Sequence, residues 1–280
     1  MKPKDYCILI PEDRDKKYKV ITYPAGEKQI RLLESELAAI QDADCIRVTA
    51  NIRDGEIMEL ALLTNALDNA VDFNGTYRQL ILPYLPYSRA DRVFCPGDCA
   101  GLATFAGQLN ALGYHHVITW DAHSNVACDF IINLVIMPST DLILKVVKKI
   151  GRKGLLILLL DKRGVRYEGI VKALGLPFVC VEKLRDAKTG ELSGFKVPAI
   201  TVPYKKILII DDICDGDGGT FADLRAVCDF ASCPLPEYYL FVTHGIFSKG
   251  TVELGAMFKK IFTSSSFKRN SIQTDVEVIK

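Results

Sequence analysis

The segment 207–221, ILIIDDICDGDGGTF, constrains the fold of this chain more than any other stretch. Its first four residues are apolar, mostly β-branched and too few for a helix, so they predict a buried parallel strand. Two acids, Asp211 and Asp212, follow at the predicted carboxyl end of that strand, where open α/β sheets place their ligand crevice. A glycine-rich loop and an apolar helical pattern come next. The segment therefore predicts a strand, a ligand-binding loop and a helix, in that order.

The glycine-rich loop, residues 215–220, has the chemistry of a phosphate site. Its glycines let backbone N–H groups turn inward, and the N-terminus of the following helix adds a partial positive charge. The carboxylates of Asp211 and Asp212 can accept hydrogen bonds from the vicinal hydroxyls of a sugar. Together these groups predict a site for a phosphorylated ribose.

Four other interpretations of the segment fit its residues less well. A P-loop requires a lysine after the glycines, and a dinucleotide fingerprint requires glycines directly after the strand. A calcium loop requires acids at alternate positions after a helix, whereas Ile213 and a strand occupy those places here. A surface turn with solvated acids is the simplest alternative, although turns rarely combine a buried strand, an acid pair and a glycine-rich helix start.

Composition limits the class of protein. The chain has 280 residues, enough for two domains, and its net charge of +1 excludes the basic field that is typical of nucleic-acid binding. No apolar run approaches the ~20 residues of a membrane helix, and charges interrupt the N-terminal segment before a signal peptide can form. The nine cysteines include no Cys-x-x-Cys pair. We therefore expect a cytoplasmic protein with reduced thiols that binds neither nucleic acid nor a membrane.

Short apolar strands alternate with helical patterns along the whole chain. The predicted strands are 45–49, 79–83, 117–121, 155–160, 178–181, 207–210 and 238–242. The predicted helices are 55–70, 100–112, 139–150, 164–174 and 219–230. This alternation predicts an α/β protein with two doubly wound, mainly parallel-sheet domains, residues 1–138 and residues 139–280.

Charged residues gather where two strands of the first half end. The segment 84–92, YLPYSRADR, carries Arg89 and Arg92, whose planar guanidinium groups can clamp phosphate oxygens. The next strand ends with Asp121 and His123. An exposed loop with a surface ion pair explains the first cluster equally well, and a structural histidine is more common than a liganding one.

Three strand ends of the second half carry similar groups. Residues 160–164 place an acid, two bases and a glycine ahead of a helix, which suits a phosphate or a metal-phosphate. Lys183 and Arg185 open a polar stretch, 187–194, which we expect to be a mobile loop. The segment 241–248 ends in polar groups over a helix start. A solvated charge cluster and an ordinary helix cap are the plain alternatives for the last two, but recurrence at strand ends favours a functional site.

The order and spacing of these clusters resemble the phosphoribosyl pyrophosphate (PRPP) synthetase family, the ribose-phosphate pyrophosphokinases, along nearly the whole chain. The segment 207–221 resembles the PRPP-binding motif that this family shares with type I phosphoribosyltransferases. The other matching motifs are Tyr-x-Arg-x-Asp-Arg at 87–92, Asp-x-His at 121–123, Asp-x-x-Gly at 161–164, Lys-x-Arg at 183–185 and Thr-His-x-x-Phe-Ser at 243–248. The resemblance implies two domains of the type I phosphoribosyltransferase kind.

For the acceptor, the resemblance implies that Asp211 and Asp212 hold the 2- and 3-hydroxyls of a ribose. The residues implied around its 5-phosphate are Asp215, Gly216, Asp217, Gly218, Gly219 and Thr220. The residues implied to bind ATP are Glu27 near the adenine and Arg89, Asp91 and Arg92 near the phosphates. Considered alone, the segment 23–27 that carries Glu27 predicts an ordinary hairpin turn.

For catalysis, the resemblance implies that Lys183 and Arg185 close over the transferring group, with His123 also in the catalytic set. His123 and Asp161 would ligate Mg²⁺, with ATP as co-substrate. The implied activity is Mg²⁺-dependent transfer of the β,γ-pyrophosphate of ATP to the 1-hydroxyl of ribose 5-phosphate, which yields AMP and PRPP for nucleotide biosynthesis. The family also implies a homo-oligomer, a dimer or a hexamer.

Three alternatives to this activity stay open. One is the same pyrophosphokinase reaction on a 5-substituted ribose such as ADP-ribose, which would belong to NAD metabolism. The others are a phosphoribosyltransferase and a non-catalytic subunit associated with PRPP synthetase. Departures from the family pattern keep them open: Ala90 stands where Gln is usual and Ala25 where Asp or Asn is usual, while Lys162 and Arg163 replace a small residue and a glycine. Asp217 is an added residue in the phosphate loop, and its charge favours an acceptor with fewer charges on the 5-phosphate.

Overall fold

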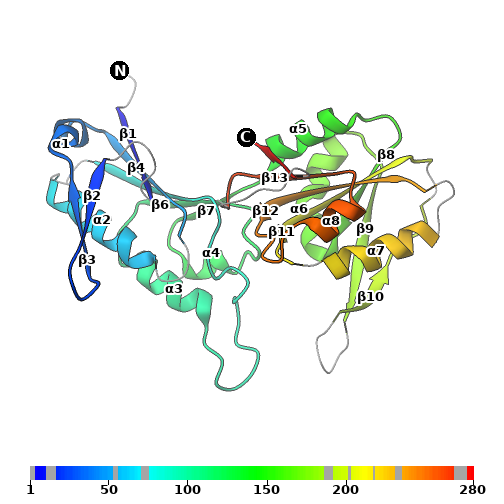
Figure 1. The fold of residues 1–280 in the computed structure, drawn as a ribbon, viewed down its shortest axis with the longest axis horizontal. Helices are drawn as coiled ribbons and strands as arrows, with labels where there is room; N and C mark the ends of the chain where they lie inside the picture. The colour runs from blue at the N-terminus through cyan, green and yellow to red at the C-terminus, as the bar shows by residue number, and fades with distance from the viewer. Residues whose placement is uncertain are drawn as a thin grey trace. The chain divides into compact units, whose positions relative to one another are not determined.

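The computed structural model of the chain describes residues 4–10, 17–52, 56–70, 76–185, 192–200, 203–216, 218–230, 235–267 and 276–280. The chain divides into two compact units, Met1–Pro138 (unit 1) and Ser139–Lys280 (unit 2), which Figure 1 shows in ribbon form. No helix within the described ranges is long and apolar enough to cross a bilayer.

Unit 1 is built on a sheet in which all neighbouring strands are parallel. Its described strands, in spatial order, are β1 (Asp5–Ile10), β4 (Cys45–Ala50), β5 (Tyr77–Leu82), β6 (His116–Trp120) and β7 (Leu134–Met137). Its described helices are α1 (Glu34–Gln41), α2 (Ile57–Ala70), α3 (Gly101–Asn110) and α4 (Ala127–Phe130). An antiparallel hairpin of β2 (Tyr18–Thr22) and β3 (Lys28–Leu32) stands between β1 and α1 in the chain.

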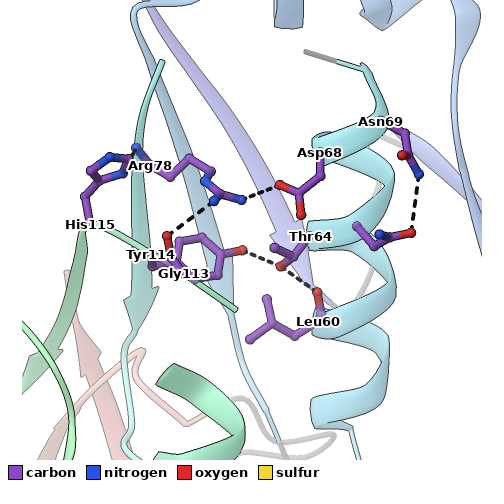
Figure 2. A network of polar contacts seen from close by, with 9 residues as sticks. Leu60, Thr64, Asp68, Asn69, Arg78, Gly113, Tyr114 and His115 are labelled. Carbon is purple, nitrogen blue, oxygen red and sulfur yellow. Dashed lines mark hydrogen bonds and ion pairs between the residues drawn. The ribbon is translucent and has the colours of Figure 1, made fainter. Parts of the chain in front are cut away.

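A polar network lies at the amino ends of β5 and β6 (Figure 2). Arg78 of β5 forms an ion pair with Asp68 of α2. The Thr64 hydroxyl of α2 lies 2.8 Å from the hydroxyl of Tyr114, which precedes β6. These contacts join a helix to two strand starts, so the polar groups at this edge stabilise the unit by bonding to one another.

Unit 2 contains a larger, mainly parallel sheet. Its described strands, in spatial order, are β10 (Leu192–Lys196), β9 (Phe178–Arg185), β8 (Leu155–Leu160), β11 (Lys206–Cys214), β12 (Glu237–Gly245), β13 (Lys260–Ser264) and β14 (Val276–Ile279). Its described helices are α5 (Thr140–Ile150), α6 (Asp161–Ala173), α7 (Gly218–Phe230) and α8 (Val252–Met257). Only β10 pairs antiparallel among these strands.

The central strand β8 matches the predicted strand 155–160, and all six of its residues are buried. Leu156, Leu158 and Leu160 pack in the core formed with α7 and α8, while the alternate residues pack in the core formed with α5 and α6. Figure 1 shows these two helix pairs on opposite faces of the sheet. A sheet covered on both faces explains the unbroken apolar run. The predicted α/β class with mainly parallel sheets is confirmed.

The strand order of unit 2 runs outward in both directions from the β8–β11 pair. β9 follows β8 on one side, whereas β12 follows β11 on the other. Open α/β sheets form their ligand crevice at the carboxyl ends of strands where the order reverses in this way. The carboxyl ends of β8 and β11 therefore mark the expected position of a site in unit 2.

Three predicted strand ends in unit 2 are wrong because long-range pairing extends the strands; one is that of β12, predicted to end at residue 242, which pairs with β11 as far as Gly245. β11 continues to Cys214, so Asp211 and Asp212 lie within the strand rather than after it. Its pairing with β8 stops at Ile210, but its pairing with β12 continues to Cys214. β9 likewise continues to Arg185, because it pairs with β10.

One segment predicted as a loop begins a helix, and the last three residues of another belong to a strand; residues 187–191 of the latter lie outside the described part of the structure. β10 begins at Leu192, inside the stretch 187–194 that was expected to be a mobile loop. α6 begins at Asp161, directly after β8, so residues 161–164 form its first turn rather than a loop before a helix.

Candidate active site

The loop after β5 is held against the start of α3. The Ala90 N–H donates to Tyr87 O at 2.9 Å, and the Leu102 N–H of α3 donates to Ala90 O at 3.0 Å. A Cβ added to Gly101 would lie 3.0 Å from Ala90 Cβ, so this glycine lets the loop pack closely on the helix. The backbone that carries Arg89 is therefore fixed by hydrogen bonds and packing on both sides.

Asp91 orients the guanidinium group of Arg92. Arg92 Nε and Nη2 donate to the two carboxylate oxygens of Asp91 at 3.0 and 3.3 Å. The Asp91 side chain is 4% exposed, whereas that of Arg92 is 60% exposed. Hydrogen bonding to Asp91 raises the pKa of Arg92 above its ordinary value. Among the described residues, none accepts a hydrogen bond from Arg92 Nη1, so this N–H group stays available to a ligand. Arg89, which is exposed, lies on the same loop.

Glu27 lies at the tip of the β2–β3 hairpin, which confirms the predicted turn. The Tyr23 N–H donates to Glu27 O at 2.8 Å, and the Gly26 N–H donates to Tyr23 O at 2.8 Å. Gly26 has a φ of +96°, which a glycine adopts without strain. Glu27 is exposed, and its side chain forms no hydrogen bond or ion pair with any residue that the structure describes. The role near the adenine stays a prediction.

The turn after β6 carries the Asp121–His123 pair. Asp121 is 1% exposed, and its N–H donates to Met137 O of β7 at 3.0 Å. Its φ of +35° is unusual for a residue with a side chain. His123 lies half-buried two residues later. This strand end therefore places one buried carboxylate and one partly accessible imidazole on a single short turn.

Asp211 and Asp212 lie at the switch point of unit 2, on the part of β11 that extends beyond β8. Asp211 Oδ1 accepts the Asp212 N–H at 2.9 Å, and Asp212 Oδ1 accepts the Ile213 N–H at 2.9 Å. Asp212 is buried and Asp211 is half-buried. Each carboxylate thus accepts a hydrogen bond from a neighbouring backbone N–H group near the carboxyl end of β11, where the sequence predicts a ribose.

The remaining predicted residues are placed only in part. Gly218, Gly219 and Thr220 form the first turn of α7, and Lys183 and Arg185 lie two residues apart on β9. Because alternate residues of a strand share a face, β9 carries the Lys183 and Arg185 positions on the same side. The side chains of Asp161, Lys183, Arg185 and Thr220, and the whole of Asp217, lie outside the described part of the structure.

A turn formed by residues 246–250 closes over the end of β11. The Ile246 and Phe247 N–H groups both donate to Cys214 O, at 2.8 and 3.0 Å. The Ser248 N–H donates to Asp215 Oδ1 at 3.4 Å. Sequence reasoning did not single out Lys249, although it directly follows the motif at 243–248; the structure places its side chain against Gly216.

A magnesium site is not preformed in the described residues. Among them, no three His, Cys, Asp or Glu side chains lie close enough together to hold a metal ion. The predicted ligands are His123 in unit 1 and Asp161, the first residue of α6, in unit 2. Mg²⁺ bound with nucleotides takes most of its ligands from phosphate oxygens and water, so few protein ligands are required, and the roles of these two residues stay predictions.

Backbone strain gathers at the predicted strand-end clusters. Within the described ranges, the non-glycine residues with positive φ are Tyr87, Asp121, Asn133 and Phe247. Such conformations cost of order 1–3 kcal/mol each and collect at functional sites. Tyr87, Asp121 and Phe247 each lie in a motif that the sequence analysis singled out. Strain at these motifs supports a functional interpretation over a plain surface turn.

The chain was compared with known proteins. A scan against protein-family models finds no match. The chain is 31% identical over 236 residues to the ribose-phosphate pyrophosphokinase of Pyrococcus furiosus, covering 82% of this chain and 78% of that protein. It is 30% identical over 234 residues to the ribose-phosphate pyrophosphokinase of Pyrococcus abyssi, covering 82% and 77%. A crystal structure of phosphoribosylpyrophosphate synthetase from Mycobacterium smegmatis matches with a TM-score of 0.73 at 18% identity, over 94% of this chain and 85% of that chain. The likeness in structure confirms the predicted fold.

Proposed function

Because this chain belongs to the ribose-phosphate pyrophosphokinase family, we propose that it transfers the β,γ-pyrophosphate of ATP to the 1-hydroxyl of ribose 5-phosphate. The products would be PRPP and AMP. The observation that carries the proposal is the position of the candidate residues. Apart from Glu27 on the β2–β3 hairpin, they lie in or next to the carboxyl ends of the main-sheet strands of each unit, in a chain 31% identical to a named family member over 82% of its length.

Unit 1 supplies the residues proposed for ATP. Arg92 suits a phosphate because Asp91 already orients its guanidinium group, so less conformational entropy is lost when a ligand binds. Arg89, exposed on the same hydrogen-bonded loop, is proposed to bind a second phosphate oxygen. Glu27, on the exposed hairpin tip, is proposed to contact the adenine.

Unit 2 supplies the residues proposed for the acceptor. Asp211 and Asp212 would accept hydrogen bonds from the 2- and 3-hydroxyls of the ribose. The loop from Asp215 to the start of α7 would surround the 5-phosphate with backbone N–H groups. The partial positive charge at the N-terminus of this 13-residue helix favours an anion at that position.

The proposed reaction is an in-line displacement at phosphorus. The 1-hydroxyl oxygen attacks the β-phosphorus in line, and the bond from that phosphorus to the oxygen bridging the α- and β-phosphates breaks. The hydroxyl proton passes to solvent, and AMP leaves with the bridging oxygen. Negative charge spreads over the phosphoryl oxygens, so the protein contributes mainly position and electrostatic stabilisation.

Lys183 and Arg185 are proposed to supply that stabilisation. β9 carries both positions on the same side, and they would bind the transferring group mainly in the transition state, which raises kcat more than affinity. Mg²⁺ bound with ATP, with His123 and Asp161 among its ligands, would neutralise charge on the phosphates. His123 would also orient the nucleotide phosphates from the turn after β6.

Product analysis tests the proposal. The protein is incubated with MgATP, with and without ribose 5-phosphate, and the nucleotides are separated by ion-exchange chromatography. We expect AMP to appear in step with consumption of ribose 5-phosphate and to be absent without it. Formation of ADP in stoichiometric amounts would show transfer of a single phosphoryl group and would contradict the proposal.

ADP-ribose is a second candidate acceptor, and the added Asp217 favours it. A carboxylate at ~5 Å from a phosphate repels each unit of its negative charge by roughly 3 kcal/mol at an effective dielectric of ~20. A 5-phosphomonoester carries nearly two charges at neutral pH, whereas the C5 phosphate of ADP-ribose carries one. The repulsion is therefore about half as large for ADP-ribose, whose product would be ADP-ribose pyrophosphate.

Relative kcat/KM values for the two acceptors decide between them. A preference of about tenfold or more for ribose 5-phosphate, unchanged by Asp217→Ala, would exclude ADP-ribose as the main acceptor. A preference for ADP-ribose that falls in the same variant would establish it, because the variant removes the charge that disfavours a monoester.

A further inference from the structure

Lys249 lies across the loop proposed to bind the acceptor phosphate, although it comes from a different segment of unit 2. A Cβ added to Gly216 would lie 3.0 Å from Lys249 Cδ, 3.1 Å from Cγ and 3.3 Å from Cε. The aliphatic part of the lysine therefore runs over the backbone of the loop. The absence of a side chain at Gly216 is what leaves room for it.

The turn that presents Lys249 is firmly attached to the loop. Two hydrogen bonds join the turn 246–250 to Cys214 O, and a longer one joins the Ser248 N–H to Asp215 Oδ1. The turn is closed by a 2.8 Å hydrogen bond from the Gly250 N–H to Phe247 O, and Phe247 is 3% exposed. The position of the lysine backbone relative to Gly216 is therefore set by the fold rather than by the long side chain.

The ammonium group of Lys249 has no ion-pair or hydrogen-bond partner within the described part of the protein, and the residue is exposed. The loop that it crosses carries Asp215 and, in the sequence, Asp217. These carboxylates oppose the attraction of a phosphate to the backbone N–H groups and the N-terminus of α7, and a nearby cation offsets that repulsion. A lysine ammonium is a mobile point charge that binds phosphates well.

We propose that the Lys249 ammonium group binds the phosphate attached to C5 of the acceptor ribose, which makes Lys249 a specificity-determining residue of the acceptor site. The inference rests on the proposed function, because it takes the acceptor to be a ribose with a phosphate at C5. Lys249 offsets the carboxylates of the loop, and its benefit is larger for a doubly charged monoester than for a singly charged diester.

The test compares three variants with the wild type. Lys249→Met keeps the packing of the stem on Gly216 and removes the charge, while Lys249→Arg keeps a cation. Lys205→Met is the matched control, because Lys205 is also exposed, lies just before the opposite end of β11 and packs against a glycine, Gly154. The KM values for acceptor and MgATP, kcat, and calorimetric binding of ribose 5-phosphate are measured for each.

For Lys249→Met we expect the KM and the Kd for ribose 5-phosphate to rise about tenfold, the effect of one charge-assisted contact. The rise for ADP-ribose should be smaller, about threefold, while kcat and the KM for MgATP stay within about twofold of the wild type. Lys249→Arg should recover most of the affinity, and Lys205→Met should change nothing.

Three outcomes would overturn the inference: an unchanged acceptor KM and Kd in Lys249→Met, a rise in the KM for MgATP instead, or an equal effect in Lys205→Met. Failure of the proposed function looks different. In that case the wild type forms no AMP with either acceptor, and calorimetry alone still reports whether ribose 5-phosphate binds and whether Lys249 contributes.

Discussion

In unit 1, one arginine–aspartate pair lies at the amino ends of the sheet strands (the amino edge) and another on the loop beyond their carboxyl ends (the carboxyl edge). The two pairs differ in which partner is exposed. At the amino edge, the Arg78 side chain is 13% exposed and its partner Asp68 is 39% exposed. At the carboxyl edge, the Arg92 side chain is 60% exposed and its partner Asp91 is 4% exposed. The Arg78–Asp68 pair buries its cation, whereas the Arg92–Asp91 pair buries the anion and presents the cation.

The surroundings of the two pairs also differ: Arg78 lies in a bonded network, and Arg92 lies on a loop with a strained residue. Arg78 lies in a network in which its Nη2 also donates to Gly113 O at 3.3 Å, and its guanidinium carbon lies 5.8 Å from the Tyr114 ring centroid (Figure 2). The loop of Arg92 contains a residue with strained φ, Tyr87. We propose that the Arg78–Asp68 pair, with its buried cation, is structural, and that the Arg92–Asp91 pair, with its exposed cation beside a strained backbone, binds a ligand.

The largest effect on activity should come from Lys183, which lies near the carboxyl end of β9 in unit 2. Lys183→Ala should lower kcat by about 10²–10³, because it removes a charged donor that acts mainly in the transition state. The KM values should change less. Lys196→Ala, on the paired strand β10, is the matched control and should leave kcat unchanged. A rise in KM with unchanged kcat would show that Lys183 binds the ground state and would contradict its proposed role in the transition state.

Arg92→Met should lower kcat/KM for MgATP by about 10–100-fold, the usual range for loss of a charged phosphate contact. The thermal midpoint should stay close to that of the wild type, because the side chain is largely exposed. Initial rates and differential scanning calorimetry measure the two quantities on the same preparation. A large drop in stability with normal activity would assign this pair a structural role instead.

Arg78→Met should show the reverse behaviour. It leaves Asp68 without its partner and removes packing on Tyr114, so we expect unfolding to become easier by about 2 kcal/mol. At a temperature where the variant is folded, kcat and KM should match the wild type. Chemical denaturation followed by circular dichroism measures the first effect. Loss of activity in a fully folded variant would contradict the assignment.

Tyr114→Phe should have the smallest effect. Burial raises the pKa of Tyr114 well above its ordinary value, so the hydroxyl stays protonated and donates to Thr64 over the usable pH range. Because Thr64 keeps its own 2.8 Å hydrogen bond to Leu60 O, only one bond is lost, worth about 1 kcal/mol. A Thr64→Val, Tyr114→Phe double mutant should show a coupling of similar size, and a coupling near zero would remove Tyr114 from the network.

The sequence predicted the fold class and the central strands well, for a physical reason. The short, unbroken run LLILLL in β8 favours a strand covered on both faces, and its predicted bounds match the structure. The ends of β9 and β11 could not be predicted, because partners far away in the chain extend them. Charged residues at those positions indicate a strand end locally, and only long-range pairing overrides that indication.

The position of the candidate site along the chain could be predicted from the sequence, but the exposure and contacts of its side chains could not. The clusters at strand ends identified the loops of Arg89 and Asp121, and the family resemblance supplied the proposed roles. The inverted exposure of the two arginine–aspartate pairs has no sequence signal, because Arg78 and Arg92 are equally polar in the chain. Nor does any local pattern connect Lys249 with Gly216, since their contact depends on the turn 246–250 packing on the end of β11.

The most direct test of the central claim follows the phosphorus atoms of ATP. ³¹P NMR of a reaction with MgATP and ribose 5-phosphate distinguishes a pyrophosphoryl group attached to a sugar from free pyrophosphate and from ADP. The account predicts two coupled resonances of a pyrophosphate ester that grow together with AMP, and only when the acceptor is present. Growth of ADP with a single new phosphomonoester resonance, or of AMP with free pyrophosphate and no ester, would contradict it.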